Sequence, residues 1–357
     1  MKDKIAVGLS GGVDSSVAAL LLKEKFNVEG IFMKNWEEDD HAEYCSAKKD
    51  LDDVQKVCEK ICIPFKKTNF SLEYWEKVFK DFLKGYKNGY TPNPDILCNK
   101  EIKFKVFLEY ALLNDKKYMA TGHYARKKVK GGIFQLLKAA DKKKDQSYFL
   151  HTLTQKELKH ALFPIGSLTK EKVRKIAKEN QLITHNKKDS TGICFIGKRK
   201  FKIFLEKYLK KNSGEIRDEN GNKLGEHDGL MFYTIGQRKG IELGGLKGKT
   251  NLPWFVVEKN IKKNVLIVAQ GKKNPLLLKN NLVTETLNWI AGKPPSEKFE
   301  CKAKIRYQQK EKLCSVHIKK DGRAEVYFQE PQRAITPGQS VVFYDNEICL
   351  GGGIIKN

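Results

Sequence analysis

The segment Gly8-Leu9-Ser10-Gly11-Gly12-Val13-Asp14-Ser15-Ser16 decides the fold of this 357-residue chain. It follows an apolar run, Ile5-Ala6-Val7, that is typical of a buried strand. Adjacent glycines let a backbone approach an anion closely, and the first N–H groups of a helix have no partner inside the helix. The segment therefore predicts a strand, a phosphate-binding loop and a helix, whose inner face carries Val17, Ala18, Leu20, Leu21 and Leu22.

The polar residues of this loop separate it from two common phosphate loops. It is neither a Rossmann GxGxxG sequence nor a Walker A loop, because no Gly-Lys-Ser/Thr ends it. Its SGGxDS pattern, with Ser10, Asp14 and Ser15, resembles the PP-loop of ATP pyrophosphatases, which cleave ATP between the α and β phosphates and adenylate a substrate. The alternative is a glycine turn that only caps a core helix, but such a turn needs none of these three polar side chains.

Composition restricts the class of protein. The length predicts two or three domains. The net charge of +25 favours a polyanionic partner such as nucleic acid, although many of the lysines stand singly, as a lysine-rich proteome would also give. The eight cysteines form no CxxC pair, so neither a zinc site nor a disulfide framework is expected, and Cys58 and Cys62 are expected to be buried on one helix.

Two features of the sequence bear on localisation. Residues 1–4 lead directly into the first strand and leave no room for a signal peptide. No segment approaches the roughly 20 apolar residues of a membrane helix. We therefore expect a cytoplasmic protein with no membrane partner.

Strands and helices alternate through the first third of the chain. Strands are predicted at residues 5–7, 28–33, 65–70 and 118–121, with amphipathic helices between them. This alternation predicts a doubly wound parallel α/β sheet, in which ligands bind beyond the carboxyl ends of the strands. The phosphate loop, Met33 and Thr121-Gly122-His123 all fall at that edge.

The rest of the chain divides into three regions that differ in their sequence pattern. Residues 146–209 read as helical, with interruptions at Pro164 and at residues 188–197. Glycine-punctuated short strands follow, and the final third alternates, with Lys302, Lys304 and Arg306 expected on one strand face. We predict an α/β domain at residues 1–212, a small β-rich central domain at 213–275 and an antiparallel β-barrel at 276–357.

Two cysteines have surroundings suited to chemistry. Asp95 stands three positions before Cys98, in a proline-stiffened loop expected to precede a helix, whose dipole would favour a thiolate. Asp95 could act as a general acid or base, although its charge opposes ionisation of the thiol. Cys194 lies in a similar setting between Gly192 and Gly197. At this point two unrelated buried cysteines remain the alternative.

Eight motifs in register resemble the bacterial tRNA-specific 2-thiouridylases, a family of PP-loop ATP pyrophosphatases. They span nearly the whole chain in the family's order: SGGVDSS (10–16), FMKNW (32–36), TPNPDILCN (91–99), TGHY (121–124), KDQSY (144–148), GICFIG (192–197), YTIGQRKG (233–240) and TPGQ (336–339). The resemblance implies an adenine nucleotide alpha hydrolase-like sheet followed by the two β domains. It also implies thiolation of the wobble uridine, position 34, in tRNAs for Lys, Glu and Gln.

The resemblance implies a nucleotide site and a sulfur site. ATP, accompanied by Mg²⁺, is expected at Gly8, Leu9, Ser10, Gly11, Gly12, Val13, Asp14 and Ser15, with Met33 and Gly122 near the adenosine. Cys194 would receive a persulfide from a sulfur-relay protein or cysteine desulfurase. Its sulfur would attack the adenylated C2, and Cys98 would then close a disulfide with Cys194 while Asp95 moves a proton.

The resemblance further implies contacts with tRNA. The target base must be turned out of its stack to be reached. Asn93, Pro94, Asp95 and His123 match positions around that base, although a histidine such as His123 is by itself more often a satisfied core residue. Other tRNA contacts are expected at Lys144, Asp145, Gln146, Arg306, Tyr307 and Gln339. Independently, the lysine and arginine face at residues 302–306 suits a phosphate backbone, with a merely solvated strand face as the alternative.

Two other functions compete with thiolation. A PP-loop amidotransferase or synthetase acting on a small molecule would need neither cysteine. A noncatalytic RNA-binding protein that keeps the nucleotide loop as a switch would bind tRNA without releasing AMP or pyrophosphate.

Overall fold

The computed structural model describes residues 2–37, 47–189, 201–244 and 251–356, and the structural statements below concern these residues. Its first sheet is parallel, in the strand order β3-β2-β1-β4-β7. The strands are β1 (Lys4–Leu9), β2 (Asn27–Lys34), β3 (Phe65–Asn69), β4 (Tyr118–Ala120) and β7 (Ala161–Leu162). The predicted parallel sheet is confirmed, with β1 at its centre.

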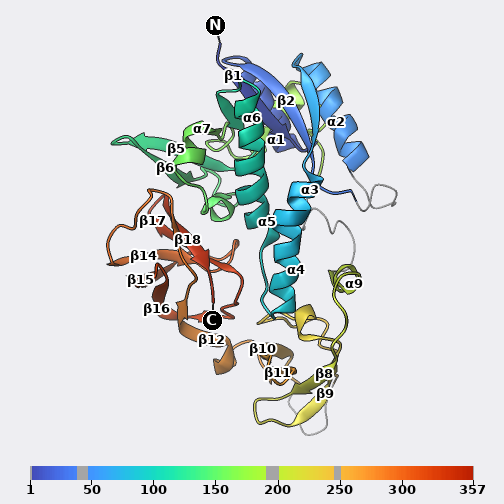
Figure 1. The fold of residues 1–357 in the computed structure, drawn as a ribbon, viewed down its shortest axis with the longest axis vertical. Helices are drawn as coiled ribbons and strands as arrows, with labels where there is room; N and C mark the ends of the chain where they lie inside the picture. The colour runs from blue at the N-terminus through green and yellow to red at the C-terminus, as the bar shows by residue number, and fades with distance from the viewer. Residues whose placement is uncertain (1, 38–46, 190–200, 245–250, 357) are drawn as a thin grey trace.

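Helices cover both faces of this sheet, as a doubly wound fold requires (Figure 1). Ile5, Val7 and Leu9 of β1 pack toward α1 (Val13–Lys23), α2 (Ala47–Lys60) and α8 (Lys170–Glu179). Ala6 packs toward the opposite helices, because successive strand residues face opposite sides. Those helices form two runs: α3 (Ser71–Tyr74), η1 (Trp75–Phe79) and α4 (Lys80–Lys87), then α5 (Pro94–Leu97), η2 (Cys98–Val106) and α6 (Phe107–Leu113).

Residues 146–209 are less helical than expected. They contain a 3₁₀ turn, η3 (Ser147–Leu150), then α7 (Gln155–His160), β7, α8 and α9 (Phe201–Glu206). The two residues of β7 pair with Met119 and Ala120 at the edge of the parallel sheet. A strand of two residues is too short to show any hydrophobic period, which explains why it was missed.

Strands β5 (Ala125–Lys130) and β6 (Ile133–Lys138) form a hairpin that the sequence pattern does not predict. Gly131 and Gly132 form its turn, with φ of +57° and +77°. Strand β6 pairs with β18 of the C-terminal sheet through Leu136 and Leu137. Two strands from the expected α/β domain therefore extend the C-terminal sheet.

The remaining strands form two further sheets. The central sheet has the order β10-β11-β8-β9, made of β8 (Gly214–Arg217), β9 (Lys223–His227), β10 (Trp254–Asn260) and β11 (Val265–Gln270), with the 3₁₀ turn η4 (Leu230–Phe232). After η5 (Pro275–Leu277), the C-terminal strands are β12 (Leu278–Val283), β13 (Asn288–Trp289), β14 (Lys298–Lys304), β15 (Lys312–Ile318), β16 (Ala324–Arg333), β17 (Ser340–Asp345) and β18 (Ile348–Ile354). Their order is β12-β16-β15-β14-β17-β18, antiparallel, and a bridge between Thr284 and Ile355 joins the two ends.

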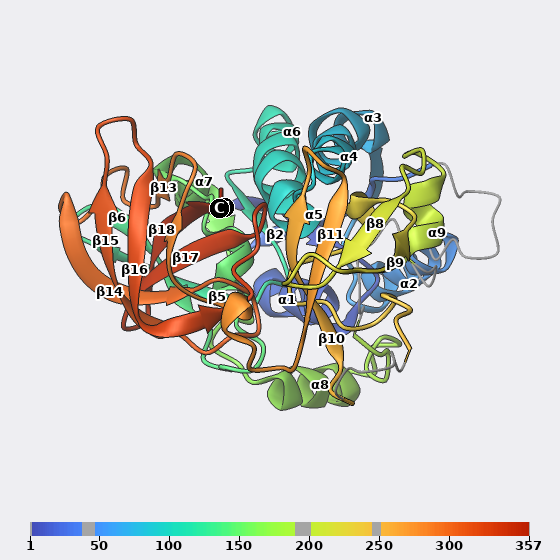
Figure 2. The ribbon, with the colours of Figure 1, turned by 90° about the horizontal axis from the view of Figure 1, so that it is seen from below.

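A single apolar cluster crosses all three sheets. It contains Phe79 and Phe107 of the helical runs, Val256 of the central sheet and Val342 and Tyr344 of β17. Figure 1 shows the helical runs between the parallel sheet and the central strands, and both Figures 1 and 2 show the C-terminal strands to one side. The chain just before α5 contacts both β-rich parts, since Thr91 bonds Thr234 of the central part and Pro337 of the C-terminal part.

Within the described ranges, no helix combines the length and the apolar character needed to cross a membrane.

Candidate active site

Residues 8–15, the predicted nucleotide loop, run from the end of β1 into the first turn of α1, as the sequence predicts. The Ser15 hydroxyl lies 3.2 Å from both the backbone nitrogen and the hydroxyl of Ser10, and it also donates to the carbonyl of Gly12. Gly11 has a φ of +71°, and a Cβ there would lie 2.7 Å from the carbonyl oxygen of Asp50. Gly12 is the N-cap of α1 and has no side chain to bond the first helical N–H groups. Those groups and the helix dipole thus remain suited to an anion.

Gly122 and Met33 lie beside this loop. A Cβ on Gly122 would lie 2.6 Å from the backbone nitrogen of Ser15, so the backbone after β4 packs directly on the first turn of α1. A Cβ on Gly8 would lie 3.0 Å from Cε of Met33. The structure thus brings Gly8, Met33 and Gly122 together at the carboxyl edge of the sheet.

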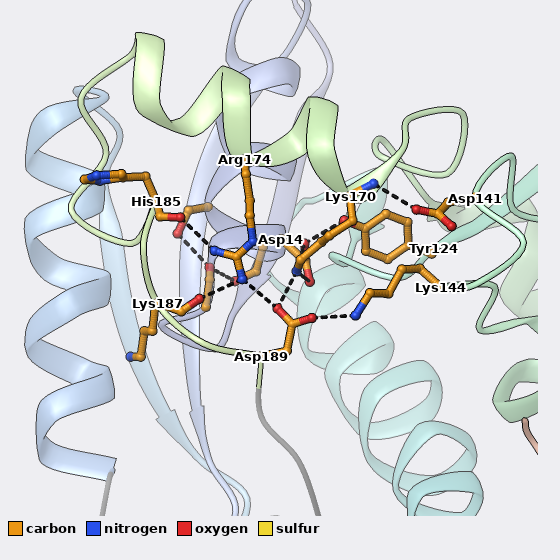
Figure 3. A network of polar contacts seen from close by, with 12 residues as sticks. Asp14, Tyr124, Asp141, Lys144, Lys170, Arg174, His185, Lys187 and Asp189 are labelled. Carbon is orange, nitrogen blue, oxygen red and sulfur yellow. Dashed lines mark hydrogen bonds and ion pairs between the residues drawn. The ribbon is translucent and has the colours of Figure 1, made fainter.

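A network of charged side chains covers the loop (Figure 3). Nζ of Lys170 lies 2.8 Å from both carboxylate oxygens of Asp14 and 2.7 Å from Oδ1 of Asp189. The Tyr124 hydroxyl donates to Asp14 at 2.8 Å. Lys144 pairs with Asp189 at 2.6 Å, and Arg174 pairs with it at 3.1 Å.

Asp189 is held ionised by this network. Burial alone would raise its pKa, but hydrogen bonds from Lys144 and Lys170 lower the pKa to about 2. Arg174 also donates to the carbonyl oxygens of His185 and Lys187. The segment that ends at Asp189 is therefore fixed to α8 and to the nucleotide loop.

Cys98 differs from its expected setting. The helical run begins at Pro94, with Asn93 as its N-cap, and continues through α5, η2 and α6. Cys98 is therefore inside the run, and its own N–H donates to the carbonyls of Pro94 and Asp95. The prediction of a loop cysteine before a helix is wrong, because proline at the first helical position starts the helix four residues earlier. The residue is 7% exposed.

Burial shifts the pKa values of Asp95 and His123. Burial raises the pKa of Asp95, and the positive charge of Lys103 opposes that rise. Burial, together with Lys103, lowers the pKa of His123 well below its usual range. His123 Nδ1 lies 2.8 Å from the hydroxyl of Thr121, and its ring packs near Phe104. A neutral histidine and a carboxyl that retains its proton more readily than usual are therefore present.

Three residues expected to contact tRNA have structural partners near the loop. Lys144 pairs with Asp189, as described above. Asp145 is buried, and its carboxylate accepts hydrogen bonds from the N–H groups of Ala139 and Ser147 and from the Ser147 hydroxyl. Gln146 accepts from the Tyr124 N–H. A direct side-chain contact between Asp145 and RNA does not fit this burial.

The expected basic face at residues 302–306 is also corrected. Lys302 is exposed, but Lys304 is half-buried, near Asp145 and Glu311. The inward positions of Cys301, Ala303 and Ile305 are confirmed, because all three are buried. Arg306 lies beyond the end of β14 at Lys304, and its guanidinium bonds other parts of the protein.

Arg306 and Gln339 join the three parts of the molecule. Nη2 of Arg306 donates to the carbonyls of Ile235 and Ala334 and to the hydroxyl of Thr336. Nε2 of Gln339 donates to the carbonyl of Thr91 at 2.7 Å. Two residues beyond Thr91 the chain reaches Asn93 and the run that contains Cys98, whereas Tyr307 packs on Phe149.

Cys194 lies outside the described residues, so its distance from Cys98 stays a prediction. Of the other described cysteines, Cys58 is buried, as expected, and Cys301, Cys314 and Cys349 are buried as well. Cys62 is exposed, with a φ of +53°, because α2 ends at Lys60. The expectation that Cys62 is buried on that helix is wrong.

In the ranges that the structure describes, no group of three or more His, Cys, Asp or Glu side chains could hold a metal ion. Asp14 is a carboxylate on the phosphate loop, and Mg²⁺ in nucleotide sites usually takes one or two carboxylates together with phosphate oxygens. The residues present therefore fit a magnesium ion that arrives with a nucleotide better than a resident one.

Sequence reasoning missed Lys170, Arg174, Asp189 and Lys103. Lys170 follows Thr169, which caps α8, but nothing in that pattern indicates a residue at a ligand site. Its position depends on how α8 packs on α1, which is a tertiary property.

Family models match three consecutive parts of the chain. A tRNA methyl transferase HUP domain matches residues 3–198, a tRNA methyl transferase PRC-barrel domain matches 202–270, and an aminomethyltransferase β-barrel domain matches 279–355.

Curated relatives match the chain over its full length. The tRNA-specific 2-thiouridylase MnmA of Francisella philomiragia is 60% identical over 355 residues, which cover 99% of each chain. The enzyme of the same name from Francisella tularensis subsp. novicida is 59% identical over 354 residues, again 99% of each chain.

Solved structures are more distant. The U34-tRNA thiolase NcsA of Methanococcus maripaludis has a TM-score of 0.36 and 20% identity, with 54% of this chain and 60% of that chain covered. NMN synthetase of Francisella tularensis has a TM-score of 0.33 and 15% identity, with 53% and 66% covered. At such TM-scores neither likeness bears on function.

Proposed function

The chain belongs to the tRNA-specific 2-thiouridylase family, and from this premise we propose that it replaces oxygen by sulfur at C2 of uridine 34 in tRNAs for Lys, Glu and Gln. It is a sulfurtransferase that acts on tRNA uridine. Its family uses ATP, and we propose that Mg²⁺ accompanies the nucleotide at Asp14. Because tRNA is the substrate, we place the reaction in the cytoplasm.

We propose that the nucleotide binds at Gly8 to Ser15, with Met33 and Gly122 beside the adenosine. Support comes from the free first turn of α1 and from the close approach of Gly122 to Ser15. Uridine O2 attacks the α phosphate of ATP, so that pyrophosphate leaves and C2 carries AMP as a leaving group. The loop's N–H groups would hold the phosphates, and Mg²⁺ would neutralise part of their charge.

Sulfur transfer then requires two thiols. The terminal sulfur of a persulfide on Cys194 attacks C2, and AMP is expelled. The Cys98 thiolate attacks Sγ of Cys194, which breaks the persulfide S–S bond, leaves sulfur on C2 and forms a Cys98–Cys194 disulfide. A thiol reductant supplies the two electrons that reopen it, and a sulfur-relay protein or cysteine desulfurase restores the persulfide.

Asp95 is our candidate for proton transfer in this sequence. It lies three residues before Cys98 on one helical run, and its burial raises its pKa. Asn93, Pro94 and His123 would surround the base. The buried, neutral His123 offers hydrogen bonding without a second positive charge.

One observation carries the proposal of a single site built from the whole chain. Gln339 bonds the carbonyl of Thr91, although 248 positions separate them. That bond places the C-terminal TPGQ turn against the entry to the Cys98 run. We propose the division into residues 1–212, 213–275 and 276–357, with tRNA contacts at Lys144, Gln146, Arg306, Tyr307 and Gln339.

Mass spectrometry of tRNA tests the reaction. The tRNA is incubated with enzyme, ATP and a sulfide donor, and the expected product shows the mass gain of oxygen-to-sulfur exchange at uridine 34. A methyl gain would instead indicate methylation, the activity in the family-model descriptions. AMP release without tRNA would favour a small-molecule synthetase, and tRNA binding without AMP release would favour a noncatalytic binder.

Cysteine variants supply the second test. Cys98→Ala and Cys194→Ala should abolish thiolation while tRNA affinity is preserved. Cys62→Ser is the matched control, because Cys62 is an exposed cysteine outside the proposed site. Retained thiolation in either alanine variant would contradict the two-thiol mechanism.

A further inference from the structure

Lys170 is a cation placed against the nucleotide loop by a different helix (Figure 3). It is the first residue of α8, and its ammonium group contacts both oxygens of Asp14 and one oxygen of Asp189. Its side chain is 12% exposed, whereas each carboxylate is 31% exposed. The lysine is therefore the most buried member of this group of three.

Asp14 creates an electrostatic problem for the proposed substrate. Its carboxylate belongs to the loop that would receive the triphosphate of ATP, and like charges repel more strongly where water is partly excluded. While no magnesium ion is bound at Asp14, Lys170 neutralises that carboxylate. It also supplies three N–H donors on a flexible stem, the usual means by which lysine binds phosphate.

Three neighbouring cations contact groups other than the nucleotide loop. Arg174 donates to the carbonyls of His185 and Lys187. Lys187 pairs with Asp50 and Asp53 of α2. Lys144 contacts Asp189. Among these four cations, Lys170 is the one that contacts the loop itself.

Hydrogen bonds hold the backbone of Lys170 in place beside the nucleotide loop. Its N–H donates to Oδ2 of Asp141 at 3.0 Å, and the Thr169 hydroxyl caps the same helical turn. The ring of Tyr124 lies 5.8 Å from the ammonium group. With its backbone fixed, the side chain can exchange one anionic partner for another by rotation alone.

We propose that Lys170 is a phosphate-binding residue of the nucleotide site, which pairs with Asp14 when the site is empty and contacts the phosphates when ATP is bound. Asp189 is the carboxylate that keeps the ammonium group over the loop. The inference rests on the proposed use of ATP and adds a residue from α8 to that site.

Binding of a non-hydrolysable ATP analogue, α,β-methylene-ATP, tests this role by calorimetry with magnesium present and without tRNA or a sulfur donor. Lys170→Met should weaken binding by about ten- to hundredfold, as expected for loss of a hydrogen bond to a charged group. Lys170→Arg should retain most of the affinity. Lys175→Met is the matched control on the same helix, since Lys175 is 72% exposed and pairs with Glu179.

A double variant separates phosphate contact from simple neutralisation of Asp14. If Lys170 contacts phosphate, Asp14→Asn with Lys170→Met should bind the analogue more weakly than Asp14→Asn alone. Equal affinities for these two variants, or an unchanged Lys170→Met, would overturn the inference. If the wild-type protein bound no analogue, the proposed use of ATP would be contradicted. If the wild type bound the analogue and Lys170→Met bound it equally well, only the role of Lys170 would be contradicted.

Discussion

At the scale of single residues, Asp95 has an environment suited to proton transfer. Burial disfavours its charged form, and Lys103 favours that form, so the carboxyl is poised between two opposing effects. A general acid or base works best when its pKa approaches the working pH. The direction of the shift is therefore the one that such a role requires.

Replacing Asp95 should affect catalysis more than binding. We expect Asp95→Asn to slow thiolation by about 10²- to 10⁴-fold, the usual contribution of general acid–base catalysis, while tRNA affinity changes little. Single-turnover thiolation and filter binding would measure the two effects. Glu101→Gln on the same helical run is the control, because Glu101 pairs with Lys100 and Lys105. Equal losses in both variants would contradict a proton-transfer role.

His151 should make stability depend on pH. Burial lowers its pKa from 6.5 to about 4, and its Nδ1 bonds the carbonyl of Tyr148. The unfolded chain therefore binds a proton more readily than the folded one, so its contribution to stability is full above about pH 6.5 and is lost as the pH falls toward 4. The free energy of unfolding should fall by at most about 1.4 kcal/mol per pH unit from this group.

Urea unfolding of the wild type and of His151→Gln across this window checks the prediction. The variant should show a shallower decline in the free energy of unfolding as the pH falls. A wild-type slope that His151→Gln leaves unchanged would assign the decline to other groups, such as the buried His123.

At the scale of secondary-structure elements, the sequence predicted those helices and strands whose formation depends on nearby residues. The β1–α1 unit and the parallel sheet followed from the hydrophobic period and from Gly11 and Gly12. The β5–β6 hairpin was missed although Gly131-Gly132 is a favoured two-residue turn, because the flanking strands are rich in lysine and are held by β18. The charged network could not be predicted, since it depends on the packing of α8 on α1.

Packing between elements also gives a prediction for Gly122. An added Cβ would lie 2.6 Å from the Ser15 nitrogen and 2.8 Å from the Asp14 carbonyl carbon, so Gly122→Ala must displace the first turn of α1. We expect a loss of about 1–3 kcal/mol of stability from overpacking and weaker nucleotide binding. Thermal unfolding and calorimetry measure these effects, with Gly244→Ala as control because no described residue lies within 4 Å of a Cβ there. Normal nucleotide affinity in Gly122→Ala would remove this glycine from the site.

At the scale of the whole molecule, hydrogen bonds from the central and C-terminal parts converge on Thr91, which precedes the helical run of Cys98. Thr91 bonds the central unit through the hydroxyl of Thr234 and the C-terminal unit through Pro337 and Gln339. Motifs more than 200 residues apart therefore come together at the entry to one helical run. If tRNA contacts all three parts, as we propose, this arrangement would link its binding to the residues proposed to surround its base.

Arg306 lies at this junction, and two effects of replacing it can be separated. Its Nη2 joins Ile235, Ala334 and Thr336, whereas its Nε and Nη1 make no hydrogen bond to any residue that the structure describes. Arg306→Ala should cost about 2–4 kcal/mol of stability, because buried acceptors lose a charged donor. If the guanidinium also meets a phosphate, the log–log salt dependence of tRNA binding should flatten by about one contact.

Arg306→Lys distinguishes the two roles, because lysine keeps the charge but lacks the planar fork that bonds several acceptors at once. It should retain the salt dependence of the wild type and lose most of the stability that Arg306→Ala loses. Lys302→Ala, an exposed lysine on β14, controls for the removal of a surface charge. An unchanged salt slope in Arg306→Ala would argue against contact with RNA, and unchanged stability would argue against the junction. Loss of stability in both variants, with a flatter salt dependence only in Arg306→Ala, would show that one guanidinium joins the central and C-terminal parts and also faces the nucleic acid.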